Sequence, residues 1–307
     1  MGISLKRILR GLMWIVLALL AVVAVQLARN WDTIRRTALG GLHTHESVPP
    51  QLPADLKHPA ILVFSKTNGF RHEEAIPAAN TMLSALAQEK GWGYFSTENG
   101  AAFNADTLSH FDAVVFSNAS GDVFNTAQQE AFKAFLESGH GYVGIHAAGD
   151  DSWKGWRWYA EQMIGTNFIG HPFNPQFQLA TVKIEDAAHP ATKGLPAEWK
   201  RTDEWYSFDK PPRQPGFTIA ATLDESTFAN HKIFGKDIAM GKDHPIAWWH
   251  CVGTGRVFYS AMGHQASAYA EPEYKAMLTG AIGWALRAEG EGCDAAASDS
   301  SAGTKAP

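Results

Sequence analysis

Cysteine is scarce in this sequence, with two residues in a chain of 307. Two cysteines exclude a small fold stapled by several disulfides and any zinc module that uses cysteine pairs as ligands. An excess of basic charge is also missing, because 26 lysines and arginines stand against 31 aspartates and glutamates, for a formal net charge of −5. A nucleic-acid-binding protein needs a basic surface to displace counterions from phosphates, so we expect no nucleic-acid partner.

Several familiar motifs are missing as well. The sequence contains no Cys-x-x-Cys, His-Glu-x-x-His, Gly-x-Ser-x-Gly or Walker loop. The stretch from Gly139 to Gly144 matches the glycine spacing of a dinucleotide-binding loop, but it precedes a predicted strand instead of opening a helix after one. No nucleotide cofactor is therefore expected.

Histidine and tryptophan, in contrast, are abundant, with 13 and 11 residues. The chain is 45% hydrophobic and 19% charged, which is a globular composition and excludes wholesale disorder. Histidine is the commonest metal ligand and titrates near neutral pH. The positions of the histidines are therefore the first guide to function.

Residues 1–28 have the composition of a membrane segment. Lys6, Arg7 and Arg10 precede an uncharged apolar run, Gly11 to Ala28, whose 18 residues are near the lower limit for crossing a bilayer. The basic flank fits a cytoplasmic N-terminus. A cleaved signal peptide and an uncleaved anchor both fit, but the run is longer than a signal-peptide core and lacks a clean Ala-x-Ala site, which favours the anchor. Both alternatives place the rest of the chain on the periplasmic or extracytoplasmic side.

Three further regions follow this segment. Residues 29–57 contain prolines and glycines without apolar periodicity and are interpreted as a linker. Residues 58–288 form the predicted folded domain, and residues 289–307 have the low-complexity composition of a disordered tail. His43 and His45 lie in the linker, where ordering two ligands is entropically costly, so we expect no site there.

The first half of the domain alternates between strand and helix patterns. The predicted strands are short apolar runs at residues 60–65, 93–96, 112–117 and 142–146. Helices are predicted from about 77 to 90 and from 126 to 138, the second with Thr126 and Gln129 as its capping box. This alternation predicts βαβ units and a parallel sheet with flanking helices.

The pattern changes after residue 150. A helix is predicted at 153–163, strands at 177–184, 217–223, 246–250 and 257–261, and a last helix from 272 to about 287. We interpret the domain as α/β with a β-rich and loop-rich insertion.

Polar side chains follow the predicted strands, at the edge where an open parallel sheet binds its ligands. The histidines at or near this edge are His72, His146, His171 and His264. The other polar candidates are Lys66, Arg71, Asn118 and Asp122, with Glu204 and Tyr206 in a predicted loop between elements.

Neutral imidazoles with a carboxylate suit a divalent metal, Zn or Mn, or metal-free acid–base chemistry. We assign His146 and His264 as catalytic or metal-binding, Glu204 as base or ligand, and His72 and His171 as supporting ligands. The remaining candidates are assigned as substrate contacts: Lys66, Arg71, Asn118, Asp122 and Tyr206.

Each residue taken alone also has an ordinary interpretation. His72 fits a solvent-exposed first helical turn, and His146 fits a buried histidine bonded to the backbone. Glu204 fits a solvated loop acid. The clustering at one edge, more than any single residue, favours a site.

Several stretches together resemble the ThuA-like family, named for trehalose utilisation. They are Gly69-Phe-Arg-His72-Glu, Gly141-Tyr-Val-Gly-Ile-His146-Ala-Ala, Phe168-Ile-Gly-His171-Pro, His189-Pro-Ala-Thr-Lys-Gly194-Leu, Asp203-Glu-Trp-Tyr206, and Gly255-Arg-Val-Phe-Tyr259 with Gly263-His264. The resemblance covers roughly residues 60–288. It implies a class I glutamine-amidotransferase-like, flavodoxin-like fold, and a role in disaccharide and glucoside catabolism through oxidised (keto) sugars.

The resemblance also removes one mechanism. Glutamine amidotransferases carry a nucleophilic cysteine at the turn after a central strand, where this chain has His146. Cys251 follows a different predicted strand, and Cys293 lies in the predicted tail. The first hypothesis is therefore a lyase, isomerase or hydrolase of sugars that uses histidine and glutamate.

Two alternatives remain open at this point. One is a non-catalytic carbohydrate-binding or scaffold protein at the membrane surface. The other is a hydrolase with a serine nucleophile, Ser117 or Ser120. The sequence does not indicate the oligomeric state.

Overall fold

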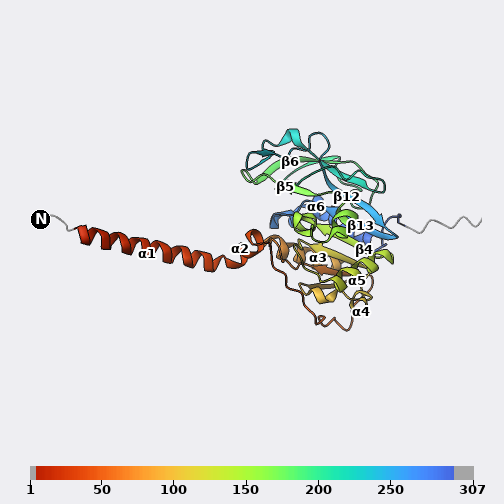
Figure 1. The fold of residues 1–307 in the computed structure, drawn as a ribbon. Helices are drawn as coiled ribbons and strands as arrows, with labels where there is room; N and C mark the ends of the chain where they lie inside the picture. Colours follow the sequence, from red (N-terminus) through yellow and green to blue (C-terminus); the bar gives the residue numbers. More distant parts are fainter. Residues whose placement is uncertain (1–4, 294–307) are drawn as a thin grey trace, which may run out of the picture.

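The computed structural model describes residues 5–293. Helix α1 (Leu5–Arg29) extends away from the domain, and α2 (Trp31–Ala38) lies where it joins the domain (Figure 1). Among the described residues, α1 is the one helix long and apolar enough to cross a membrane, and none of its apolar stretch is buried. Its composition is compatible with a membrane anchor or a signal sequence.

A nine-stranded sheet forms the core of the domain. Its parallel half consists of β1 (Ala60–Phe64), β2 (Gly93–Thr97), β3 (Ala113–Ser117), β4 (Gly141–Ile145) and β13 (Gly255–Ser260). Their order, β2-β1-β3-β4-β13, is the flavodoxin-like arrangement. All residues of β1, β3, β4 and β13 are buried, which explains why these strands are apolar throughout rather than alternating. The predicted fold class is confirmed.

Three helices of the domain begin and end close to the predicted positions: α3 (Ala75–Lys90), α5 (Thr126–Glu137) and α6 (Pro272–Ala285). The short helix α4 (Ala105–Leu108) was not predicted. Helix α3 ends at Gly91, whose φ of +72° allows the left-handed cap. The predicted capping box of α5 is displaced by one residue, because Asn125 and Gln128 form it.

The second half of the chain extends the same sheet with antiparallel strands. They are β12 (Pro245–Val252), β9 (Thr218–Asp224), β6 (Phe177–Ile184) and β7 (Glu198–Glu204), in that order from β13. Two separate pairs are β5 (Phe168–Gly170) with β8 (Ser207–Phe208), and β10 (Lys232–Ile233) with β11 (Lys236–Asp237). The predicted loop at 203–206 is wrong in part, because Asp203 and Glu204 end β7.

The helix predicted at 153–163 is also wrong in part. Only a short π-helix forms there, Tyr159–Ile164, after a 3-10 turn at Asp151–Trp153. The rings of Trp153 and Tyr159 stack at 4.4 Å, although residues six apart lie on different sides of a regular helix. Aromatic packing therefore overrides the helical pattern in this segment.

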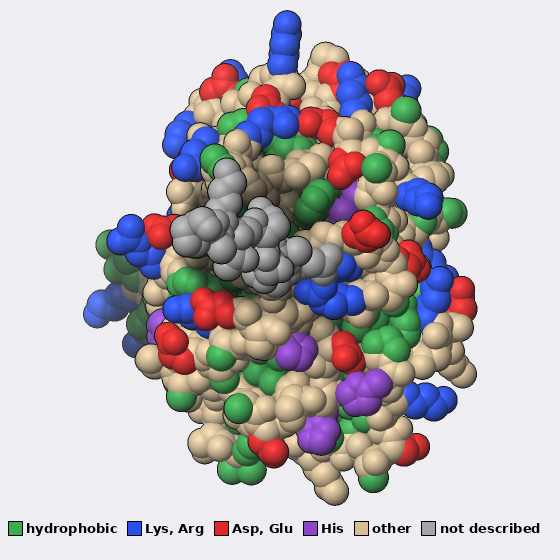
Figure 2. Space-filling model, turned by 90° about the vertical axis from the view of Figure 1, so that its right-hand side faces the viewer, with side chains coloured by type: hydrophobic (Ala, Val, Ile, Leu, Met, Phe, Trp, Pro, Cys, Tyr) green, Lys and Arg blue, Asp and Glu red, His purple; other side chains and the backbone are tan. Residues whose placement is uncertain are grey.

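The segments at both ends of the domain are held against it. After α2, the Leu42 N–H donates to the Asn68 carbonyl at 2.7 Å, and Glu46 pairs with Lys66 at 2.7 Å. At the other end, a disulfide joins Cys251 on β12 to Cys293. The rest of the predicted tail, residues 294–307, lies outside the described residues. On the face turned away from α1, acidic and basic side chains are interspersed (Figure 2).

Candidate functional site

Three histidines and one glutamate converge at the carboxyl ends of the strands. His146 directly follows β4, His264 lies shortly beyond β13, and His72 lies between β1 and α3. Glu204 is the last residue of β7 and comes from the antiparallel half of the sheet. One potential ligand atom from each of these residues lies within 4.8 Å of all the others. The structure thus brings together four of the predicted site residues.

The three closest ligand atoms form a nearly equilateral triangle. His146 Nε2 lies 3.2 Å from His264 Nδ1, and Glu204 Oε2 lies 3.4 Å and 3.1 Å from these two nitrogens. Ligand atoms around a tetrahedral zinc ion with bonds of 2.0–2.1 Å are separated by about 3.3 Å. The spacing therefore fits a divalent metal.

The orientation of His146 is set by the backbone. Its Nδ1 lies 2.8 Å from the Ala261 carbonyl oxygen, which can only accept a hydrogen bond, so Nδ1 carries the proton. In the neutral ring, Nε2 then presents a lone pair to the Glu204 carboxylate. A metal ion or a shared proton between these donor atoms would satisfy both groups. Metal-binding histidines typically donate their other N–H to such a carbonyl.

Glu204 is buried, so its interpretation as a solvated loop acid is wrong. Its Oε1 accepts a hydrogen bond from Gln176 Nε2 at 2.6 Å and lies 3.2 Å from His171 Nδ1. Burial acts to raise the pKa of Glu204, but its interactions with the side chains of His146 and His264 outweigh burial and hold this pKa well below its ordinary value. The group is therefore an ionised carboxylate, as a metal ligand must be.

His72 is buried as well, so it is not the solvent-exposed residue of its ordinary interpretation. Its ring lies 4.7 Å from the ring of His146 and 4.5 Å from that of His264. Its Nδ1 is buried and has no hydrogen-bond partner among the described residues. Burial, together with the two neighbouring histidines, lowers the pKa of His72 well below its ordinary value. His72 is therefore a neutral imidazole with an unused donor or acceptor nitrogen.

The loop that carries His264 is held by a buried ion pair. The carboxylate of Asp203 accepts hydrogen bonds from the N–H groups of Gly263 and His264, at 2.8 and 3.2 Å. Arg201 pairs with the same carboxylate at 2.9 Å. Asp203 thus compensates for the charge of Arg201 and positions His264 at once.

Three members of the cluster, His72, Glu204 and His264, line a cavity of about 420 Å³, whereas His146 is fully buried and is not part of its lining. Phe70, Phe168, Phe173 and Tyr206 provide aromatic surface to this cavity, and Arg36 and Asp150 are among its charged residues. Small-molecule sites in proteins are commonly about 300–1,000 Å³, mainly apolar, with a few convergent polar groups. The cavity therefore has the size and lining of a site for a small molecule.

Of the predicted substrate contacts, Tyr206 lines this cavity and the other four do not. The Lys66 ammonium is bound by Glu46 from the N-terminal segment, and the Arg71 guanidinium is bound by Glu98 and Glu73. Asn118 is fully buried, with its Nδ2 donating to Tyr269 at 2.9 Å. These partners come from distant parts of the chain, so strand position alone did not reveal them.

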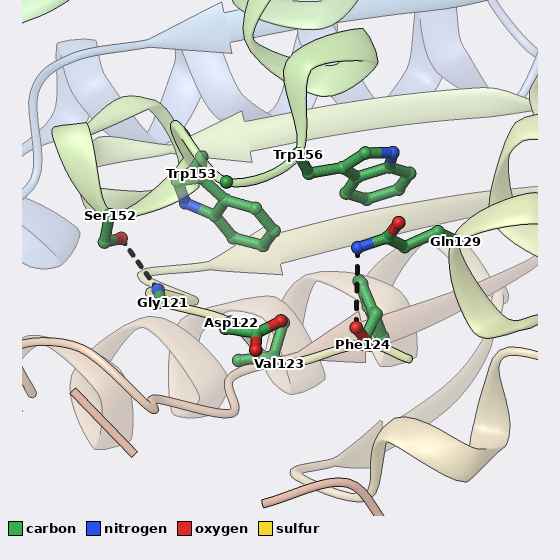
Figure 3. A pocket seen from close by; sticks show the side chains of 9 residues that line it. Gly121, Asp122, Val123, Phe124, Gln129, Ser152, Trp153 and Trp156 are labelled. Carbon is green, nitrogen blue, oxygen red and sulfur yellow. Dashed lines mark hydrogen bonds between the residues drawn. The ribbon is translucent and has the colours of Figure 1, made fainter. Parts of the chain in front are cut away.

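Asp122 lines a different and much smaller hollow, of about 30 Å³, beside Trp153 and Trp156 (Figure 3). Its carboxylate pairs with His43 and His45 of the predicted linker, at 2.9 and 3.4 Å. The serine alternative also loses support, because Ser117 and Ser120 do not line the large cavity. Ser120 Oγ instead donates to the Phe70 carbonyl at 2.6 Å.

Several residues that shape the site are not among the candidates drawn from the sequence. The rule that ligands bind beyond the carboxyl ends of parallel strands does not select Gln176, Asp203 or Arg201, because none of them follows a predicted parallel strand. Arg36 comes from the predicted linker. Asp150 follows His146 by four residues and lines the cavity. Burial raises the pKa of Asp150 to about 7, against opposing hydrogen bonds from Ser152. Its position in the strand-end stretch from His146 to Asp150 was the signal that could have identified it.

Comparisons with known proteins agree with this architecture. The family model described as ThuA, trehalose utilisation, matches residues 60–285. A solved ThuA-like protein from Bacteroides uniformis ATCC 8492 is 24% identical, with a TM-score of 0.63 over 77% of this chain and 94% of that chain. A second, from Parabacteroides merdae ATCC 43184, is 18% identical, with a TM-score of 0.58 over 76% of this chain and 91% of that chain.

The search of curated proteins finds no match. The two solved structures support the fold, and the family match spans the whole sheet, from β1 to the end of α6. It includes His72, His146, Glu204 and His264. This chain is a member of the ThuA family.

Proposed function

We propose that this protein is an exported, membrane-anchored enzyme that acts on a sugar or keto-sugar at the histidine–glutamate cluster. The cluster would hold a divalent metal, Zn or Mn, through His146, His264, Glu204 and His72. The observation that carries the proposal is the convergence of His146 Nε2, His264 Nδ1 and Glu204 Oε2, which lie 3.1–3.4 Å from one another. A metal ion would use these three atoms and a nitrogen of His72 at once, whereas a shared proton would use two donor atoms.

The substrate class rests on the family and on the cavity. The family is described by trehalose utilisation, which supports a role related to sugar metabolism. The cavity combines aromatic faces with charged groups, and these are the surfaces that stack on sugar rings and bind hydroxyl groups.

Export rests on two features outside the site. Helix α1 has the length and composition of a membrane anchor. The disulfide between Cys251 and Cys293 is of the kind that persists in oxidising compartments. Together they favour a domain on the extracytoplasmic side of the membrane.

A keto-sugar has an acidic C–H bond beside its carbonyl group. A bound divalent metal would polarise the carbonyl oxygen. His171 lines the cavity, and its Nδ1 is directed at two acceptors, Glu204 Oε1 and the Pro172 carbonyl oxygen. The proton of the neutral ring therefore lies on Nδ1. The lone pair on Nε2 is left to take the C–H proton of the substrate. The C–H electron pair then forms the C=C bond of the enolate, and the carbonyl π pair moves to oxygen.

Asp150 is placed to return a proton. If the proton returns to a ring carbon, the product is an isomer of the substrate. If the proton is transferred to a glycosidic oxygen that leaves from the carbon β to the carbonyl, the reaction is an elimination. A carboxyl with a pKa of about 7 is substantially protonated at neutral pH and can serve as this donor.

Metal analysis of the purified full-length chain, with assays on disaccharides and their keto forms, tests the proposal. We expect stoichiometric Zn or Mn in the wild type, and loss of metal and activity in His146→Ala and His264→Ala. His110→Ala, which changes an exposed histidine, is the matched control and should retain both. A fully active wild type without metal would exclude the metal version, and unchanged activity in both site variants would exclude the site.

A second candidate function is carbohydrate binding without catalysis. It is favoured by Phe70 and Phe173, which line the cavity and are 44% and 48% exposed, as in sugar-binding clefts. Calorimetric binding of a disaccharide with no product detectable by mass spectrometry would support this function over the enzyme.

A further inference from the structure

We infer that the mouth of the cavity rests on the lipid surface, held there by α2 and by the tip of the β10–β11 hairpin. This inference rests on the proposed membrane anchoring. It adds an orientation of the domain and a second membrane contact, distant in sequence from the anchor.

Only a short segment of chain separates the anchor helix from the cavity. Helix α1 ends at Arg29, and hydrogen bonds from Asn30 N–H to Gln26 and from Ile34 N–H to Asn30 continue the helical turns into α2. Arg36, which lines the cavity, follows Arg29 by seven residues, or about 10 Å at helical rise. The headgroup layer is roughly 5–8 Å thick on each side of the hydrocarbon core. The cavity mouth therefore lies at the depth of the headgroups or just above them.

This connection is fixed to the domain. The side chain of Arg36 donates to the carbonyl and hydroxyl oxygens of Thr67, which follows β1. Three residues beyond α2, the Gly41 N–H donates to the Arg35 carbonyl at 3.0 Å, and Leu42 then bonds to Asn68. The domain thus has little freedom to rotate away from the membrane, because α2 forms part of its cavity wall.

Helix α2 has the composition of an interfacial segment. Trp31 is 50% exposed at its beginning, and Leu39, immediately after its end, is 59% exposed. Arg35 is exposed between them, whereas Arg36 is bound to Thr67, and Asp32 in the first turn is the one acid of the helix. Tryptophan and basic residues are favoured at the membrane–water interface, where the ring lies among the headgroups and the cations pair with lipid phosphates.

The second contact comes from the β10–β11 hairpin. Phe234 at its tip is 92% exposed, and it is flanked by Lys232 and Lys236. Its ring lies 5.1 Å from that of Phe173, which lines the cavity, so the tip stands beside the mouth. Asp237 is the single acid of the hairpin, and it accepts a hydrogen bond from the Ala239 N–H at 3.0 Å.

An exposed aromatic ring between two lysines fits a lipid surface. The ring gains from entering the apolar boundary, and the ammonium groups gain from anionic headgroups. Phe70, Phe173 and Phe234 are therefore exposed apolar side chains beside one opening, on the side of the domain that carries α2. Covering by a membrane accounts for all three exposures and for the position of Arg36.

Site-directed fluorescence in membranes tests the orientation. Because both native cysteines form the disulfide, a single engineered cysteine in the full-length chain can be labelled with an environment-sensitive fluorophore. Phe234→Cys and Lys232→Cys place the label on the hairpin. Glu89→Cys, an exposed position at the end of α3 on the opposite edge of the sheet, is the matched control. The proteins are reconstituted in phosphatidylcholine–phosphatidylglycerol vesicles containing a headgroup-spin-labelled lipid.

We expect the spin-labelled lipid to quench the hairpin labels at least about threefold more than the Glu89→Cys label. Equal quenching at the three positions, in protein that floats with the vesicles, would overturn the orientation and leave the anchor intact. Protein that does not float with the vesicles would overturn both the proposed anchoring and this inference.

Discussion

His146 combines an unusual backbone conformation with its side-chain role. Its φ is +53°, a left-handed conformation that is uncommon for a residue with a Cβ atom. Tyr259 donates a hydrogen bond to the His146 carbonyl at 2.8 Å, and His146 Nδ1 is held by Ala261. These bonds hold the sharp turn after β4, which directs the imidazole toward Glu204 and His264.

Asp203→Asn tests how far the His264 loop depends on its buried support. The change removes the fully buried carboxylate that pairs with Arg201, which keeps Glu271 at 3.4 Å, and it weakens the acceptor of two loop N–H groups. We expect metal affinity to fall by about 10–100-fold and the free energy of unfolding to fall by about 3 kcal/mol. Metal titration and urea unfolding would measure these effects.

Glu198→Gln, at the exposed beginning of the same strand, is the control and should change neither quantity. Wild-type metal affinity in Asp203→Asn would show that the loop positions His264 without this carboxylate.

Asp150→Asn tests the proposed proton donor. Asp150 lines the cavity, and its Oδ1 accepts the Ser152 N–H at 2.8 Å. The amide keeps the shape of the side chain but cannot release a proton, so we expect kcat at pH 7 to fall by about 100-fold with unchanged metal content. Asp106→Asn alters an exposed acid that does not line the cavity and should have a small effect. A full rate in Asp150→Asn would remove the residue from the mechanism.

At the scale of elements, buried side chains join segments that are distant in sequence. His250 on β12 donates from Nε2 to the Met163 carbonyl in the π-helix at 2.9 Å, and its ring stacks on Phe217 at 3.9 Å. Burial lowers the pKa of His250 to about 4, so the folded protein keeps this ring neutral. The ring thereby links the irregular 159–164 segment to the sheet.

This shift predicts a loss of stability in acid. Between pH 6.5 and about 4 the unfolded chain binds a proton at His250 and the folded chain does not, so the free energy of unfolding falls as the pH falls. From pH 7 to pH 5 we expect about 2 kcal/mol less stability from this residue. Urea unfolding of His250→Gln should show a correspondingly smaller pH slope than the wild type, whereas His110→Gln should keep the wild-type slope. Identical slopes in all three proteins would contradict the assignment.

At the scale of the whole molecule, a disulfide links the segment after α6 to the sheet. The disulfide joins residues 42 positions apart, Cys251 on β12 and Cys293 beyond α6. A closed loop of this length stabilises a folded protein by up to about 4 kcal/mol through the entropy of the unfolded chain.

The Cys251→Ser, Cys293→Ser double variant should therefore unfold at lower urea concentration than the oxidised wild type, with a loss of about 2–4 kcal/mol. The wild type treated with a reductant should match the variant. Equal urea midpoints for the oxidised wild type and the variant would show that the packing of residues 289–293 stabilises the domain equally well without the disulfide.

Much of this architecture was predictable because it depends on local patterns. The buried parallel strands are apolar along their whole length, as at β1 and β4, and the carboxyl ends of parallel strands share one edge. His72, His146 and His264 could therefore be predicted as neighbours, with support from the family resemblance. The apolar composition of residues 11–28 likewise predicted the exposed helix α1.

What the sequence by itself determined is the periodicity of burial, and hence the fold class and which residues end the strands. Only the tertiary structure decided which of those polar residues meet. Lys66 and Asp122 are bound by Glu46, His43 and His45, from a segment without periodicity, while Glu204 reaches the cluster from the far edge of the sheet. Such pairings depend on where long-range packing places the backbone, and no local pattern encodes that placement.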